Sequence, residues 1–123
     1  VNAVVSHVAA NSGVRAVLRR AQRSWARQRG GGVLEGRDIG SVVFPRAKLK
    51  VYVTATPEER ARRRSLESGR SIEEILAEIQ GRDEIDSSRA DSPLAVSANA
   101  IIVDTTGKSL DEVAEEVLRS FNG

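Results

Sequence analysis

Hydrophobic and polar positions follow two different periods along the chain. In four segments apolar residues recur every three or four positions, which is typical of a helix with one buried face. In three other segments they form short apolar or β-branched runs, which are typical of strands in a covered parallel sheet. The expected helices begin near residues 12, 57, 72 and 110, and the expected strands span residues 33–35, 49–54 and 100–104.

The starts of the helices have recognisable capping residues. Three begin with Ser or Thr followed three residues later by Glu, the pattern of a capping box, and one of these also has Pro at its first position. Ser12 is a candidate cap for the first helix. The very polar stretch 58–71 is expected to be a mobile, charged surface segment between two helices. The three capping pairs are Thr56 with Glu59, Ser71 with Glu74, and Ser109 with Glu112.

The order of these elements predicts the fold class. Strands that alternate with helices favour a three-layer α/β architecture, in which helices flank a parallel sheet. No internal repeat or linker interrupts the pattern, and 123 residues is the length of one small domain. We therefore expect a single α/β domain over residues 1–123.

Composition narrows the classes of function. No cysteine is present, so disulfides and thiolate chemistry are excluded, and no apolar run approaches the roughly 20 residues of a membrane span. We expect a cytoplasmic protein with no membrane partner. The net charge is only +2, so nucleic acid is not an expected partner. Of the 19 basic residues 16 are arginine, whose planar fork suits phosphate and carboxylate groups.

The segment EGRDIG at residues 35–40 places two charged residues after an expected strand. Ligands bind at the carboxyl ends of strands in open α/β sheets, so Arg37 is suited to a phosphate and Asp38 to a hydroxyl or amino group. Gly40 allows a turn or a close approach to a ligand. The alternative is a local Arg37–Asp38 ion pair that steadies a turn, and six residues do not decide between the two.

Two further groups of arginines have the same ambiguity. If the helix from residue 72 continues, Arg82, Asp86 and Arg89 lie on one face of it. They then either bind a polyanion or form exposed ion pairs with one another. Arg60 and Arg64, one helical turn apart, either close over a phosphate chain together with Arg63 or belong to a solvated helix end.

Other motifs carry no chemistry in the sequence. Gly107-Lys108 follows a strand, but a phosphate-binding loop needs Gly five residues before that pair, and position 102 is Ile. We expect an ordinary turn there. His7 is the single histidine and has no ligand spacing with other residues, so we expect no metal site made by the chain.

Taken together, and in this order, these segments resemble the C-terminal part of bacterial cytidylate kinases. The resemblance rests on VLEGRDIGSVVFPRAKLKVYVTATPEERARRR, ILAEIQGRDEIDSSRADSPL and AIIVDTTGKSLDEV, and VVSHVAANSGVRAVLRRAQRSW is similar to the family's nucleotide-binding region. It implies a P-loop nucleoside monophosphate kinase-like fold. It also implies transfer of the ATP γ-phosphate to CMP or dCMP, giving CDP or dCDP.

The resemblance also implies roles in binding the acceptor base and its phosphate. Ser6, Arg15 and Asp38 would recognise the cytosine. Arg37 would meet the phosphate of the acceptor.

The remaining roles concern the pentose and the phosphates. Arg82 and Asp86 would contact the pentose of the acceptor, and Arg89 the phosphates. Arg60 and Arg64 would act in catalysis from a lid that closes over ATP.

The sequence departs from the family pattern in ways that set expectations. The Gly-rich ATP-binding loop is absent from these residues, so we expect an incomplete sheet without the P-loop strand, and no activity from this chain alone. The lid is expected at about residues 58–88, shorter than usual after Arg64. ATP with Mg²⁺ is the expected co-substrate, and an incomplete chain is open to self-association. Two alternatives stay open: a basic nucleic-acid-binding module, and a related kinase with a different acceptor.

Overall fold

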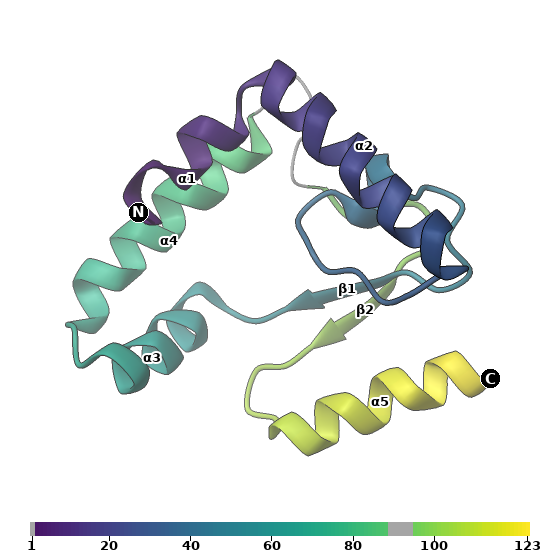
Figure 1. Ribbon diagram of the computed structural model, residues 1–123. Helices are drawn as coiled ribbons and strands as arrows, with labels where there is room; N and C mark the ends of the chain where they lie inside the picture. The colour runs from purple at the N-terminus through teal and green to yellow at the C-terminus, as the bar shows by residue number, and fades with distance from the viewer. Residues whose placement is uncertain (1, 89–94) are drawn as a thin grey trace. The chain divides into compact units, whose positions relative to one another are not determined.

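The structure, a computed structural model, describes residues 2–88 and 95–123, and the chain divides into two compact units. Val1–Ala47 and Arg82–Ala98 form the first unit, and Lys48–Gly81 and Asn99–Gly123 form the second. Helix α4 (Ile72–Ser87) runs from the second unit into the first. The first unit also contains α1 (Asn2–Ala9), α2 (Ser12–Arg29) and the turn η1 (Ile39–Val43), and the second contains β1 (Val51–Thr54), α3 (Pro57–Ser68), β2 (Ile101–Asp104) and α5 (Leu110–Asn122) (Figure 1).

Helix α2 is the longest element and is capped at both ends. Asn11, not Ser12, caps its start: the side-chain oxygen accepts hydrogen bonds from the amides of Gly13 and Val14 at 3.0 and 3.1 Å. The expected Ser12 cap is therefore wrong by one residue, because Asn11 is the residue with extended backbone and an oxygen in reach of the free amides. Gly30 ends the helix in the left-handed conformation.

The strand expected at residues 33–35 does not form. Residues 31–35 have no regular secondary structure, and the side chain of Val33 is 98 % exposed. Three residues offer few backbone hydrogen bonds and need a paired neighbour to stay extended as a strand.

The second unit is built around two parallel strands, which lie side by side in Figure 1. They lie within the segments from which strands were expected. Val103 is fully buried on this sheet, whereas its register partner Val53 is 59 % exposed. Beyond the strands, Thr105 donates from its amide and its hydroxyl to the carbonyl of Thr54, at 2.8 and 3.0 Å. The paired residues are Val51 with Ile101, Tyr52 with Ile102, Val53 with Val103, and Thr54 with Asp104.

The polar stretch after β1 folds mostly as helix α3, and the mobility expected of it stays a prediction. Glu59 binds Arg62 three residues on and Arg63 four residues on, and such pairs stabilise a helix that has few apolar residues. The apolar side of α3 and α4 is small. Ala61, Ile75 and Ile79 form its buried cluster, with Leu76 packed against it.

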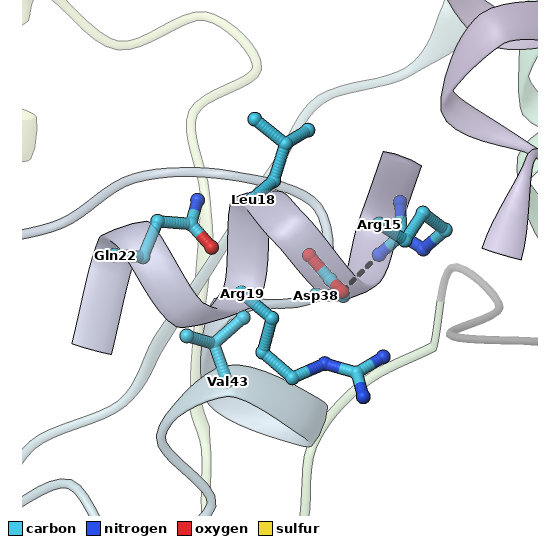
Figure 2. Close-up of a pocket in the computed structure, with 6 residues that line it drawn as sticks. All are labelled: Arg15, Leu18, Arg19, Gln22, Asp38 and Val43. Carbon is cyan, nitrogen blue, oxygen red and sulfur yellow. Dashed lines mark hydrogen bonds and ion pairs between the residues drawn. The ribbon is translucent and has the colours of Figure 1, made fainter. Parts of the chain in front are cut away.

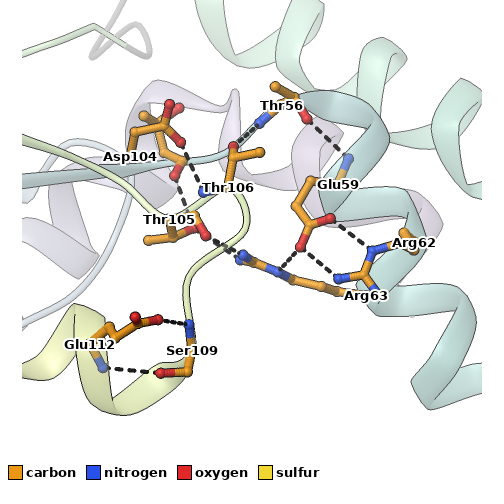
Figure 3. Close-up of polar contacts among 10 residues, drawn as sticks. Thr56, Glu59, Arg62, Arg63, Asp104, Thr105, Thr106, Ser109 and Glu112 are labelled. Carbon is orange, nitrogen blue, oxygen red and sulfur yellow. Dashed lines mark hydrogen bonds and ion pairs between the residues drawn. The ribbon is translucent and has the colours of Figure 1, made fainter.

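The capping residues expected for α3, α4 and α5 are confirmed. Thr56 accepts from the amide of Glu59, and Ser71 from that of Glu74. The α5 box is complete, because Ser109 accepts from the amide of Glu112 while the Glu112 carboxylate accepts from the amide of Ser109 (Figure 3). Those hydrogen bonds lower the pKa of Glu112.

The turn before α5 is the ordinary strand-to-helix connection that the sequence predicts. Gly107 takes a left-handed backbone conformation, and the amide of Lys108 donates to the carbonyl of Thr105 at 3.0 Å. The Lys108 ammonium pairs with Glu116 at 2.7 Å.

The α/β class with parallel strand pairing is confirmed. The three-layer arrangement, the missing P-loop strand and the single-domain organisation stay predictions. None of the helices in the described ranges combines the length and the apolar character that crossing a membrane requires.

Candidate functional site

A buried ion pair joins helix α2 to the segment EGRDIG. The guanidinium of Arg15 binds the carboxylate of Asp38, and their side chains are only 9 % and 13 % exposed. A second guanidinium nitrogen of Arg15 donates to the carbonyl of Ala9 at 3.3 Å, which fixes the direction of the fork. A charge-assisted pair with so little water around it is well suited to reading a polar ligand.

A small hollow adjoins this pair. Its volume is about 50 Å³, well below the roughly 300–1,000 Å³ of pockets that hold whole ligands. Figure 2 shows Asp38 facing Arg15, with the other lining side chains from α2 and η1 around them. The lining residues are Arg15, Leu18, Arg19, Gln22, Asp38 and Val43.

Arg37 turns to a different partner, in the C-terminal part of α4. Its guanidinium lies 2.6 Å from Asp86 Oδ2 and 3.3 Å from Asp83 Oδ1. The Asp86 side chain is 2 % exposed, and Arg82 Nε lies 3.8 Å from the same oxygen. Asp86 therefore stands between the guanidinium groups of Arg37 and Arg82. The contact with Arg82 is the one expected from the helical spacing, whereas the contact with Arg37 was not expected, and Arg89, the second expected neighbour, lies outside the described residues.

These contacts decide one alternative left by the sequence. Arg37 and Asp38 are not a pair with each other: Asp38 binds Arg15, 23 residues earlier, and Arg37 binds Asp86 in α4. The EGRDIG segment thus connects two separate parts of the first unit.

Arg23 is a residue whose contact the sequence did not reveal. Its guanidinium donates to the carbonyls of Val43 and Val42, at 2.9 and 3.0 Å. The sequence alone assigned no role to Arg23. Its acceptors are main-chain oxygens of a turn 19 and 20 residues away, which no side-chain pattern shows.

The two arginines expected in the lid lie in helix α3 of the second unit. Arg60 is half-buried and Arg64 is exposed, one turn further along. Arg63 has a structural contact: it donates to the Thr105 hydroxyl at 2.9 Å and to the Thr105 carbonyl at 2.6 Å (Figure 3). Arg63 therefore ties α3 to the end of β2, which differs from the phosphate contact considered for it.

Glu59 completes this network at the start of α3. It accepts two hydrogen bonds from Arg62 at 2.8 Å and one from Arg63 at 2.9 Å. These bonds, with that of Arg62 contributing most, lower the pKa of Glu59 to about 2. The carboxylate is consequently ionised at all ordinary pH values.

The side chains of two expected site residues lie outside the part of the chain that the structure describes. Arg89 lies outside the described residues, and so does the side chain of Ser6, although its backbone belongs to α1. Among the residues that the structure does describe, no group of three or more His, Cys, Asp or Glu side chains is arranged to hold a metal ion.

The parallel strands and the helices define an α/β protein, and the hollow in its first unit is lined by Arg15, Arg19 and Asp38 among other residues. The family is given by comparison: the family model for cytidylate kinase matches residues 1–123. The chain belongs to the cytidylate kinase family.

Individual relatives agree with this assignment. The chain is 49 % identical over 123 residues to a cytidylate kinase of Desulfitobacterium hafniense (strain Y51), covering 96 % of this chain and 53 % of the relative. It is 45 % identical over 121 residues to a cytidylate kinase of Cereibacter sphaeroides (strain ATCC 17023), covering 94 % and 59 %. A bifunctional pantoate ligase/cytidylate kinase of Synechococcus sp. (strain JA-2-3B'a(2-13)) is 49 % identical over 122 residues, covering 95 % and 22 %. The chain thus spans about half the length of the single-function relatives.

Proposed function

We propose that this chain is the acceptor-binding and lid portion of a kinase that phosphorylates CMP and dCMP. In the reaction an oxygen of the acceptor phosphate attacks the γ-phosphorus of ATP. The bond from that phosphorus to the β–γ bridging oxygen breaks, and ADP leaves with CDP or dCDP as the other product. The observation that most supports the proposal is the family match over the whole chain, joined to a buried Arg15–Asp38 pair in a region rich in arginine.

The Arg15–Asp38 pair is proposed to read the cytosine, together with Ser6. A carboxylate accepts hydrogen bonds from the exocyclic amino group of cytosine, whereas uracil presents a carbonyl there and leaves the carboxylate unsatisfied. The hollow of about 50 Å³ is too small for a nucleotide, so the base is proposed to bind with movement of the side chains that line the hollow. Arg15 is proposed to keep the Asp38 carboxylate oriented toward the base.

Arg37 is proposed to bind the acceptor phosphate. Asp86 holds its guanidinium at 2.6 Å, and a fork fixed in this way loses little freedom when it binds an anion. Arg82 and Asp86 are further proposed to contact the pentose, and Arg89 the phosphates.

Catalysis is proposed to depend on arginine side chains that neutralise charge and on the alignment of the acceptor with the γ-phosphate. Phosphoryl transfer spreads negative charge over the transferred group, and guanidinium groups neutralise it without gaining or losing a proton. Arg60, Arg64 and Arg89 are the proposed catalytic residues, with Arg60 and Arg64 in the lid. The described residues offer no cluster for a metal ion, so Mg²⁺ enters the proposal as the ion that accompanies the ATP phosphates, and no step is assigned to it.

Calorimetric titration of the chain with CMP, UMP and AMP tests the proposal. We expect preference for CMP, and we expect Asp38→Asn to weaken CMP binding by tenfold or more, roughly the 1–3 kcal/mol of an unmade hydrogen bond. Arg20→Ala is the control, because Arg20 is exposed on the same helix as Arg15. Equal affinity for the three nucleotides, with folding verified by circular dichroism, would contradict the proposal.

A further inference from the structure

Side chains of helix α2 bind the segment 38–43 at the start and at the end of that segment. At the first end Arg15 binds the Asp38 carboxylate. At the second end, two turns further along the helix, the fork of Arg23 binds two successive carbonyls, those of Val42 and Val43. Both contacts lie within the first unit.

The main chain between these two anchors forms a single wide turn. The carbonyl of Asp38 accepts hydrogen bonds from the amides of Val42 at 2.9 Å and Val43 at 3.2 Å, and that of Ile39 accepts from Phe44 at 2.7 Å. The bonds that span five residues are those of a π-helical turn, a rare conformation that occurs mostly inside a longer α-helix. No α-helix continues this turn among the described residues on either side of it, so it depends on support from outside. Val42 and Val43 have two contacts each. Their amides bind the carbonyl of Asp38, and their carbonyls bind Arg23, so the position of the Asp38 backbone depends on the two residues that Arg23 holds.

Arg23 provides that outside support. The last carbonyls of a helical turn have no partner within the turn, and Val43 is only 2 % exposed, so water has little access to its carbonyl, while Val42 is half-buried. A buried carbonyl without a partner is costly, and a guanidinium fork supplies two donors at a fixed spacing. A lysine at this position has the same charge but no fork.

We propose that Arg23 is a positioning residue, which fixes the 38–43 turn and thereby holds Asp38 in place against Arg15. The effect of Arg23 on which nucleotide is selected rests on the proposed function, because Asp38 is the group proposed to bind the cytosine. Arg23 itself is not proposed to touch the ligand and acts only through the turn.

Hydrogen exchange on the free chain tests the anchoring without reference to any ligand. In Arg23→Lys the amides of Val42, Val43 and Phe44 should exchange roughly tenfold faster, because one charge-assisted hydrogen bond to the turn is lost. Arg20→Lys is the matched control, with the same change on an exposed position of the same helix. Unchanged exchange of the three amides in Arg23→Lys overturns the inference.

A double-mutant cycle with CMP tests whether Arg23 acts through Asp38. Arg23→Lys alone should weaken CMP binding about tenfold, but less than about twofold when Asp38→Asn is already present, because the group to be positioned is gone. Effects that simply add overturn the inference, since a general loss of stability would lower affinity in both backgrounds. Absence of CMP binding by the unmodified chain contradicts the proposed function, and the exchange result then decides the role of Arg23.

Discussion

Two aspartates of α4 face the same guanidinium but in different surroundings. Asp86 and Asp83 lie 2.6 and 3.3 Å from Arg37, yet their side chains are 2 % and 28 % exposed. Water can replace part of what Asp83 provides, but it has no access to the Asp86 carboxylate. The energetic weight of a residue in this cluster therefore depends on burial more than on its charge.

Replacing each aspartate by asparagine tests whether burial determines how much it contributes to stability. Asp86→Asn should lower the free energy of unfolding by about 2 kcal/mol, because an amide offers Arg37 a weaker acceptor and buries donors of its own. Asp83→Asn is the control and should cost less than about 1 kcal/mol. Urea denaturation measures both variants, and equal losses would show that burial does not set their contributions.

Helix α3 is held in place mainly by contacts between charged and polar side chains. Its Glu59 holds Arg62 and Arg63, and Arg63 in turn reaches Thr105 at the end of β2 (Figure 3). The start of the helix is thereby fixed to the sheet with few apolar contacts. The proposed phosphate-binding residues Arg60 and Arg64 lie on the helix that this network orients.

The lowered pKa of Glu59 predicts how stability responds to acid. Its pKa is lowered in the folded chain, to about 2 from an ordinary value near 4.5, so its contribution is complete above pH 4.5 and is lost as the pH falls toward 2. Glu59→Gln lacks this contribution at every pH. The melting temperature of the unmodified chain should exceed that of Glu59→Gln at neutral pH, and the difference should shrink as the pH falls through that range.

The control for this experiment is Glu58→Gln. Glu58 is exposed and lies in the same first turn of α3, so it shares the field of the helix terminus but not the pair of arginines. A gap between the unmodified chain and Glu59→Gln that stayed constant down to pH 2 would contradict the assignment.

At the scale of the whole chain, the sheet connects segments that are 50 residues apart. Val51–Thr54 and Ile101–Asp104 pair in parallel, and helices α3 and α4 occur in the sequence between them. This pairing closes the second unit, and its stability rests on few buried side chains. Val103 is fully buried, while Val53 beside it is 59 % exposed.

The register pair Val53 and Val103 offers a matched test of that dependence. Val103→Ala should lower the free energy of unfolding by about 2 kcal/mol through lost burial and the space left behind. Val53→Ala removes the same atoms from an exposed position and should cost less than about 0.5 kcal/mol. Similar losses in thermal or urea unfolding would contradict the view that Val103 belongs to the core of this unit.

The sequence by itself determined the features that depend on near neighbours. Capping at Thr56, Ser71 and Ser109, the helices that follow, and two of the three strands involve contacts within a few residues, so a local pattern encodes them. The order of motifs along the chain also indicated the family, which the comparisons confirmed.

Only the tertiary structure decided which groups meet across long stretches of chain. It left Val33 exposed outside any strand, gave Arg37 and Asp38 separate partners, and directed Arg23 to main-chain carbonyls. Arginine has the same fork wherever it occurs in a sequence, and its choice of acceptor depends on which oxygen the folded chain brings within about 3 Å. That choice is a long-range property, so no pattern of neighbouring residues records it.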